Sequence, residues 1–139
     1  MGFGHLKQLE VGEKTARFTL PIIEGVLILK PATEANKPYF NKVLKSSRQR
    51  NLRIARTKTV DADALVEGRE NDRELFPLYV VVGWEKVTDE SGKIVEFSIE
   101  ECQSFFEQLP DWMLDEIRHF ASDVSNFIDI MDVEEKIKN

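Results

Sequence analysis

The side chains with the most potential for chemistry in this 139-residue chain are its two histidines and its single cysteine. His119 has Asp115 four residues before it and Asp123 four residues after it, so on a helix the three would share one face. Zinc accepts imidazole and carboxylate ligands, but one imidazole with two carboxylates is a weak set without another His or Cys. His5 lies close to the N-terminus. We therefore predict no metal site, and interpret the three residues as an exposed ladder of charges.

Cys102 could act as a nucleophile only with a histidine base and an activating environment. Its place in the first turn of a predicted helix would lower its pKa through the helix dipole. The same place makes it the partner of Phe97 in a hydrophobic staple, which explains the residue without catalysis. The only glycine-rich segment near a helix start, GFG at the N-terminus, lacks the strand and the Lys-Ser/Thr of a phosphate loop. We expect no cofactor, and we do not expect an enzyme.

Charge is distributed unevenly along the sequence. Residues 35–60 carry eight basic and no acidic side chains, whereas residues 61–139 carry seven basic and twenty-one acidic ones, within a net charge of -6. A basic block can bind a polyanion, or it can meet the acidic part of the same chain or of a second copy. Because the pI is about 5.0, far below that of typical nucleic-acid-binding domains, we favour a protein contact, with self-association as one form of it.

Local patterns in the first 60 residues predict a hairpin followed by a helix. Residues 16–20 and 25–30 are short and β-leaning, and a Pro-Ile-Ile-Glu turn joins them. Asn36 is a suitable N-cap for a helix from residue 37 to about 48, with apolar residues at helical spacing. Residues 51–59 alternate between apolar and basic, which predicts a strand or extended chain.

The middle of the chain is harder to assign. Asp61 could cap a helix beginning at Ala62, but Gly68 and the polar residues 69–74 interrupt its apolar pattern. Residues 75–82 contain three consecutive valines, which favour a strand by propensity. Their apolar residues also fit one helix face, with Gly83 as the C-terminal stop.

The C-terminal half carries the clearest local signals. Residues 87–95 have turn chemistry around Gly92 between two β-compatible arms. Ser98 and Glu101 form a capping box for a helix ending near residue 109, before a proline. A second helix, from residue 111 to about 131, has apolar residues at i, i+3, i+4 and i+7.

These patterns predict an α+β fold that is mainly helical: an N-terminal β-hairpin followed by a small helical domain ending in a capped helix pair. We expect residues 1–139 to form a single domain, with the hairpin and basic helix in residues 1–60 and an acidic helical part in residues 61–139. The sequence has no apolar run near the roughly 20 residues that span a bilayer, and its start lacks the apolar region of a signal peptide. A single cysteine suits a reducing compartment. We therefore expect a cytoplasmic protein without membrane contact.

Several short motifs together resemble bacteriophage tail assembly chaperones and related small tail accessory proteins. They are YVVVGWEKVTDESGK at residues 79–93, FS at 97–98, FF at 105–106 and LPDW at 109–112. In that group a polar helix leads into the Gly-Trp stretch, Phe-Ser opens a helix, and Leu-Pro separates it from a final helix ending in Asn-Phe, here Asn126 and Phe127. The resemblance covers residues 75 to about 127. It departs from the group at residues 94–96, where relatives often have prolines.

The resemblance implies a mostly helical protein of the host cytoplasm that binds tail components, the tape measure and tail tube proteins, without catalysis or a cofactor. It also favours a helix for residues 75–82. On this interpretation five aromatic residues form the helical core and its contact edge: Trp84, Phe105, Phe106, Trp112 and Phe127. Four basic residues form an electrostatic contact: Lys45, Arg48, Arg50 and Arg53.

Two alternatives remain open at this stage. The chain could be a permanent structural component of the virion, such as a tail or connector subunit. It could also be a nucleic-acid-binding regulator that uses residues 37–58, in which case its binding would fall steeply with salt.

Overall fold

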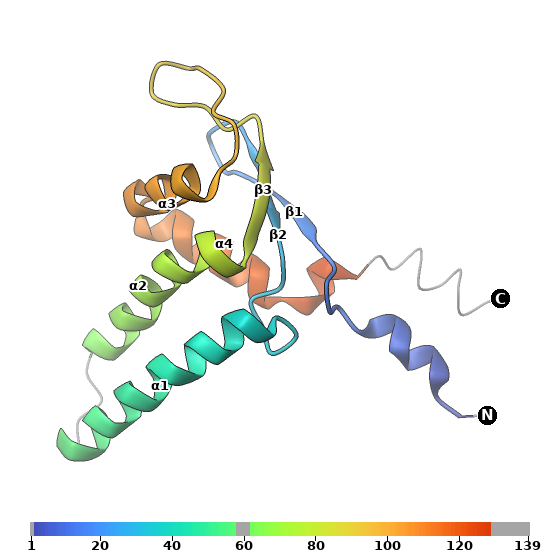
Figure 1. The fold of residues 1–139 in the computed structure, drawn as a ribbon, viewed down its shortest axis with the longest axis vertical. Helices are drawn as coiled ribbons and strands as arrows, with labels where there is room; N and C mark the ends of the chain where they lie inside the picture. The colour runs from blue at the N-terminus through green and yellow to red at the C-terminus, as the bar shows by residue number, and fades with distance from the viewer. Residues whose placement is uncertain (1, 58–61, 129–139) are drawn as a thin grey trace.

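The computed structural model of the protein describes residues 2–57 and 62–128, with the side chains of residues 2–47 and 66–128. Two long helices extend together from a small sheet, and two shorter helices pack beside it (Figure 1). The strands are β1 (Ala16–Thr19), β2 (Val26–Leu29) and β3 (Val81–Glu85), and the α-helices are α1 (Lys37–Thr57), α2 (Ala62–Tyr79), α3 (Ile99–Gln108) and α4 (Asp111–Ser122). Short 3-10 helices occupy Gly4–Leu9 and Val124–Phe127. The predicted α+β fold, with an N-terminal hairpin followed by helices, is confirmed.

The described residues form a three-stranded antiparallel sheet in the order β1-β2-β3. The predicted hairpin is confirmed: Thr19 lies opposite Val26, and β2 is the central strand. Leu27 and Leu29 of β2 are fully buried. The sequence did not predict β3 as a third strand of this sheet. The two long helices lie between β2 and β3 in the chain, and α2 brings the chain back beside the hairpin.

The start of α1 was predicted correctly, but its length was not. The Tyr39 N–H donates to the Asn36 side-chain oxygen at 3.4 Å, and the Asn36 amide also donates to the Tyr79 carbonyl at 2.8 Å. The helix continues to Thr57, so the predicted strand at residues 51–59 is wrong as far as residue 57, and residues 58 and 59 lie outside the described part. Residues 51–57 include one leucine, one alanine and two arginines, all of which are good helix formers. That propensity outweighs a short alternation of apolar and basic residues.

In α2 the polar residues 69–74 do not interrupt the helix, because they contact neighbouring elements. Asp72 is buried and accepts hydrogen bonds from the Tyr39 hydroxyl at 2.7 Å and from Arg118 Nε at 2.7 Å. Burial, followed by the nearby Asp72 carboxylate, raises the pKa of the Tyr39 hydroxyl. The helix begins at Ala62 as expected, and Asp61, its predicted cap, lies outside the described residues.

Residues 75–82 prove to be both helix and strand. The helix extends to Tyr79 with Pro77 buried inside it, and β3 begins at Val81. The resemblance therefore indicated the correct structure for residues 75–79 and the wrong one for the last two valines. Those valines extend the sheet beside β2, where β-branched side chains pack well.

The last predicted helix ends earlier than expected, at Ser122 rather than near residue 131. Asp123 accepts hydrogen bonds from the Ser125 N–H at 3.0 Å and the Ser125 hydroxyl at 2.6 Å. This local bonding competes with the helix and starts the 3-10 turn. The turn places Phe127 in the core beside Phe120, with ring centroids 6.2 Å apart. Residues 129–131 lie outside the described part.

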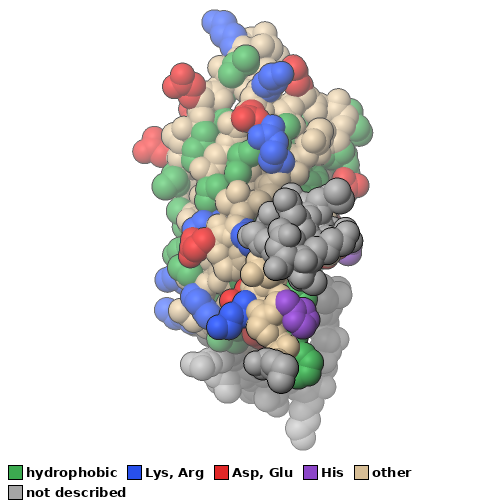
Figure 2. All heavy atoms as spheres, turned by 90° about the vertical axis from the view of Figure 1, so that its right-hand side faces the viewer, with side chains coloured by type: hydrophobic (Ala, Val, Ile, Leu, Met, Phe, Trp, Pro, Cys, Tyr) green, Lys and Arg blue, Asp and Glu red, His purple; other side chains and the backbone are tan. Residues whose placement is uncertain are grey.

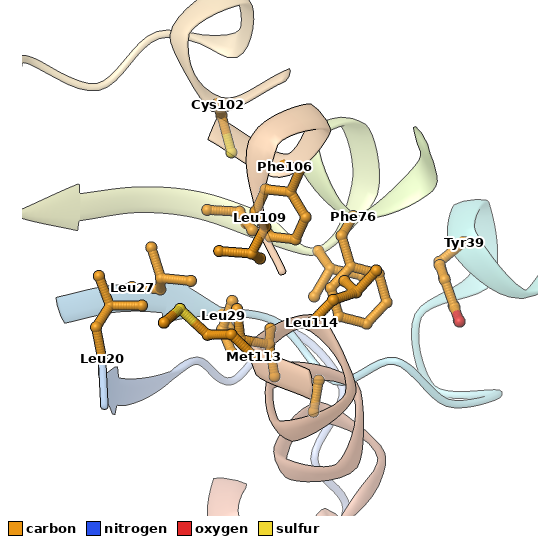
Figure 3. Packing of buried hydrophobic residues seen from close by; sticks show 14 of the residues in the cluster. Leu20, Leu27, Leu29, Tyr39, Phe76, Cys102, Phe106, Leu109, Met113 and Leu114 are labelled. Atoms are coloured by element: carbon orange, nitrogen blue, oxygen red, sulfur yellow. The ribbon is translucent and has the colours of Figure 1, made fainter. Parts of the chain in front are cut away.

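The hydrophobic core lies between the sheet and helices α2, α3 and α4. Leu29 from β2, Phe76 from α2, Phe106 from α3 and Leu114 from α4 are all fully buried and point toward one another (Figure 3). Val81 of β3 belongs to the same cluster. Because all of these elements share one core, packing fixes the relative positions of β3, α3 and α4.

The Arg73 side chain forms hydrogen bonds that join α3 and α4 at the corner between them. Its guanidinium donates to the Phe106 carbonyl at 2.6 Å, the Leu109 carbonyl at 2.7 Å and the Asp111 carboxylate at 2.6 Å. Two of these acceptors are carbonyls at the C-terminal end of α3, where the regular hydrogen bonds of the helix run out. The Phe106 carbonyl also accepts the Leu109 N–H at 3.3 Å. Arg73 thus holds the end of one helix and the start of the next in a single contact.

Candidate protein-binding groove

A partly apolar groove of about 490 Å³ lies where the β1–β2 turn, the loop after β3 and the α3–α4 corner meet. Its lining comes from segments far apart in the sequence: Ile23, Trp84, Val87, Thr88, Asp89, Glu90, Val95, Glu101, Ser104, Phe105, Gln108, Leu109, Pro110 and Met113. The volume falls within the range of about 300–1,000 Å³ that is usual for ligand-binding clefts.

Trp84 forms the centre of the apolar lining, at the end of β3. Its indole N–H donates to the Val95 carbonyl at 2.8 Å, which fixes the ring plane. The ring meets Phe97 and Phe105 edge-on, with centroids 5.4 Å and 5.6 Å away. Such aromatic pairs stabilise by about 0.5–1.5 kcal/mol beyond the area they bury. The groove therefore presents a preformed aromatic surface.

One wall of the groove is a face of α3. Glu101, Ser104, Phe105 and Gln108 recur at the i, i+3, i+4 and i+7 spacing of a single helix face. The helix starts as predicted, since the Ser98 hydroxyl oxygen accepts the Glu101 N–H at 3.0 Å.

Cys102, which follows Glu101, points away from the groove into the core and is fully buried. Burial raises the pKa of its thiol to about 12, so it is a neutral thiol at pH 7. This is the opposite of the lowering that a helix dipole alone would produce.

The other wall is the loop after β3, which has the turn that was predicted. Asp89 accepts hydrogen bonds from the Ser91 N–H, the Ser91 hydroxyl and the Lys93 N–H at 2.9, 2.7 and 3.0 Å. Gly92 has a φ of 84°, which glycine adopts at little cost. Bonding from the Ser91 hydroxyl, then from the Lys93 amide, holds the pKa of Asp89 below its usual range. Asp89 is therefore an anion at neutral pH.

The rim of the groove is acidic. Asp89, Glu90 and Glu101 line it, and none of the lining residues within the described part of the chain is basic. Lys86 and Lys93 lie on the same loop but outside the lining, and both are exposed. Figure 2 shows that acidic, basic and hydrophobic side chains all reach the surface at the upper end of the molecule, where Figure 1 places this loop. An apolar lining with a negative rim favours a ligand that is apolar and cationic.

The structure separates the predicted aromatic residues into three groups. Trp84 and Phe105 line the groove, whereas Phe106 and Phe127 are buried in the core and do not reach the surface. Trp112 is 46% exposed at the start of α4 and does not line the groove. The aromatic residues grouped by sequence therefore do not share one surface.

The predicted basic contact lies on α1, away from the groove (Figure 1). Lys45 is exposed. Arg48, Arg50 and Arg53 belong to the same helix, and their side chains lie outside the described part.

Two aliphatic residues at the β1–β2 turn were not singled out from the sequence. Ile22 is 92% exposed and has a φ of 71°, a conformation that β-branched residues rarely adopt. The Ile23 N–H donates to the Pro21 carbonyl at 2.8 Å, which closes a tight three-residue turn. Ile23 itself is 47% exposed and lines the groove. A signal was present, because two adjacent isoleucines are unusual in a tight turn, where polar residues and glycine predominate.

Asp115, considered above as a possible metal ligand with His119, forms ion pairs with two arginines. Arg69 Nε donates to it at 3.0 Å and Arg118 at 3.3 Å, and the contact with Arg69 is the main cause of its lowered pKa. Across residues 2–57 and 62–128, no group of three or more His, Cys, Asp or Glu side chains could hold a metal ion. No helix within those ranges is long and apolar enough to cross a membrane.

Comparison with known proteins gives one match. No curated protein and no solved structure matches the sequence. The family model described as YdaY prophage protein matches residues 35–139, which include α1 to α4, β3 and the loop that lines the groove. This match covers well over half of the chain, so the chain belongs to the YdaY prophage protein family and is a protein of phage origin.

Proposed function

We propose that this phage protein is a tail accessory protein of the assembly-chaperone type. It would bind tail components, such as the tape measure and tail tube proteins, while the virion is being built, and would itself carry out no reaction. The expected site of action is the host cytoplasm.

This proposal rests on one observation: the motifs that resemble tail assembly chaperones also supply most of the groove's lining. The motifs at residues 79–93, 105–106 and 109–112 resemble tail assembly chaperones. The same motifs supply eight of the groove-lining residues: Trp84, Val87, Thr88, Asp89, Glu90, Phe105, Leu109 and Pro110. Val87 and Leu109 are buried in the core, whereas the other six are half-buried or exposed and line an open concave surface.

The physical properties of the groove suit transient binding. A tape measure protein is a long helical chain whose apolar faces need shielding before the tube encloses them. A groove of about 490 Å³ gives a modest contact area, and small interfaces are typical of complexes that separate again. An acidic surface would limit aggregation of the complex.

The proposal is tested by capturing the tagged chain from cells in which the phage is replicating, and identifying the bound proteins by mass spectrometry. Purified virions are analysed in parallel. We expect tail proteins in the captured material and no copies of the chain in virions. Abundant copies in virions would instead identify a permanent structural component, and recovery of nucleic acid without tail proteins would favour the regulator.

A matched pair of variants assigns the binding to the groove. Ile23→Asp places a charge in the groove at a residue that is already 47% exposed. Ile94→Asp makes the same change at a residue that is 68% exposed and lies outside the lining. We expect the first variant to lose the tail proteins and the second to keep them.

A further inference from the structure

The chemistry of the groove restricts the class of segment that it can hold. Trp84, Phe105 and Met113 provide apolar and aromatic contacts, whereas Glu90 and Glu101 are exposed acidic groups at the edge. A purely apolar ligand would leave the rim carboxylates without partners, and an acidic ligand would be repelled by them. The matching ligand has an apolar face bordered by lysine or arginine.

The geometry favours a helix over a peptide that adds a strand. Strand addition needs free backbone groups at the binding surface. Here the loop's backbone is already paired: the Val95 N–H donates to the Val87 carbonyl at 2.8 Å, and the Val95 carbonyl accepts the Trp84 indole. The Asp89 N–H likewise donates to the Lys93 carbonyl at 2.9 Å. Side chains therefore make the recognition surface, as they do when a helix binds in a groove.

The size of the groove defines how such a helix would lie. A helix with its side chains is about 10–12 Å across, so about 490 Å³ is the volume of roughly one turn, too little to enclose a whole helix. The ligand's apolar side chains would enter the groove while its axis lies across the mouth. Its flanking cations would then face Glu90 and Glu101.

The β1–β2 turn supplies a second, independent observation. Ile22, in its positive-φ conformation, immediately precedes the groove-lining Ile23 in the chain and is almost fully exposed. Such a backbone conformation costs on the order of 1–3 kcal/mol and is concentrated at binding sites. The turn therefore adds the apolar side chain of Ile23 to the surface that a bound helix would cover.

In its described half, residues 37–47, the chain's own basic helix does not present the required apolar face. In Figure 1 most of α1 lies at the opposite end of the molecule from the loop after β3, so it does not reach the groove of its own chain. In a second copy, the apolar face of α1 is already in use, since Tyr39 is buried and Val43 packs against the core. Three of the six residues that α1 exposes in its described half are lysines, and Leu44, 40% exposed, is the one large apolar side chain exposed there.

We infer that the groove binds a basic amphipathic helix of a partner protein, with the helix's apolar face on Trp84 and Phe105 and its cations against the acidic rim. This inference rests on the proposed function, because it names the partner class of the same groove. Trp84 is the natural reporter of binding.

The test uses the full chain carrying Trp112→Phe, which leaves Trp84 as the only tryptophan. Three synthetic 18-residue helices are titrated: one of leucine and lysine with an amphipathic pattern, one with each lysine replaced by glutamate, and one with each leucine replaced by alanine. We expect saturable change in Trp84 emission with the leucine–lysine helix alone. Equal binding of the leucine–glutamate helix would overturn the inference.

Matched double variants distinguish the effect of the rim charges on binding from the effect of the overall negative charge. Glu90→Gln with Glu101→Gln removes two rim charges, and the glutamine at position 101 still suits a capping box. Glu107→Gln with Glu116→Gln removes two exposed charges outside the groove. We expect the rim variant to weaken binding at low salt by roughly 2- to 30-fold, as two exposed ion pairs would, and the other to change it little. Equal losses would overturn the inference.

Two further outcomes distinguish the inference from the proposed function. If tail proteins are captured but Ile23→Asp does not release them, the proposed function stands and the groove inference fails. If the leucine–lysine helix binds but no tail protein is captured, the inference stands and the proposed function fails. Concentration-dependent association of the chain alone, abolished by Ile23→Asp, would mean that a second copy fills the groove and would also overturn the inference.

Discussion

At the scale of single residues, Gly25 has the tightest surroundings in the β1–β2 turn. It has a φ of 133° and is buried. A Cβ at this position would lie 2.9 Å from the Leu20 Cδ1 and 3.1 Å from the Val87 Cγ2. The turn therefore approaches the loop after β3 more closely than any side chain would allow, and this approach brings Ile23 to the groove.

Replacing Gly25 with alanine should lower the free energy of unfolding by about 1–3 kcal/mol, because the new side chain would be strained and crowded. The measurement is urea denaturation. Gly4→Ala is the matched control, since nothing lies within 4 Å of a Cβ at that position and its φ is not positive. Equal, small effects of the two substitutions would contradict the close approach at Gly25.

Cys102 gives a prediction for pH dependence. Because burial raises the thiol pKa from 9.0 to about 12, the unfolded chain loses this proton at a lower pH than the folded chain. The contribution of the neutral thiol to stability is therefore complete below pH 9 and is lost as the pH rises toward 12. At pH 8 we expect a thiol reagent to modify the native protein slowly and the urea-unfolded protein quickly.

The control for Cys102 is the double variant Cys102→Ala with Gln103→Cys, which moves the thiol to an exposed neighbouring position. It should react at the rate of the unfolded protein. Fast modification of the native wild-type chain would show that Cys102 is accessible, and that its burial does not control its reactivity.

At the scale of elements, α2 connects the other helices through its polar residues. Arg69 pairs with Asp115 of α4, Asp72 bonds to Tyr39 of α1 and Arg118 of α4, and Arg73 holds the α3–α4 corner. The groove depends on this corner, because Leu109 and Pro110 line it. The polar residues that look like an interruption in the sequence are thus the ones that position the wall of the groove.

Replacing Arg73 with methionine should destabilise the fold by about 1–3 kcal/mol, because the α3 carbonyls would lose a charged donor in a site where the arginine side chain is only 13% exposed. Lysine should rescue little, since it lacks the planar fork that reaches several acceptors. Arg17→Met is the control: Arg17 pairs with Glu85 on the surface, and we expect little change. The midpoint of urea denaturation compares the three.

Local signals in the sequence identified those elements whose ends are set by local chemistry. The hairpin, the Asn36 cap, the Gly92 turn and the Ser98 cap depend on residues close together in the chain, and all were predicted. The end of α4 was not, because Asp123 reads as one more polar position on an amphipathic stripe. Asp123 could either accept a hydrogen bond from Ser125 or continue the helix by another turn. The hydrogen bond is favoured because it lets Phe127 reach the core.

The groove could be predicted only in part. Trp84 and Phe105 are large aromatic residues beside turn and capping signals, so they were selected from sequence. Ile23 joins them only through the pairing of β2 with β3, which depends on contacts between distant segments. The burial of Phe106, next to Phe105 on the same helix, likewise follows from which face of α3 meets α2.

At the scale of the whole molecule, the basic helix and the acidic rim lie apart. The rim lies at the end of the molecule opposite the free end of α1, which carries no acidic residue along its length (Figure 1). An acidic partner surface would be attracted by the basic residues of α1. Long-range attraction of this kind is screened over about 10 Å at 0.1 M salt.

Replacing Lys45, Arg48, Arg50 and Arg53 together with serine should weaken binding of captured tail proteins more at low salt than at high salt, because the lost attraction is electrostatic. The measurement is the amount of each tail protein retained across a salt series. Equal loss at every salt concentration would contradict an electrostatic role for these residues. A circular dichroism spectrum of the variant checks that the helix remains.

The position of β3 has a consequence for the order of folding. β2 and β3 are neighbours in the sheet, yet both long helices lie between them in the sequence. Pairing across so long a loop is slow unless something shortens the search, because closing a loop costs entropy before any contact repays it. The helical hairpin of α1 and α2 can form from nearby residues and returns the chain to β2. We therefore expect the sheet to be completed last, with substitutions in the α1–α2 contact slowing refolding and substitutions in β3 mainly speeding unfolding.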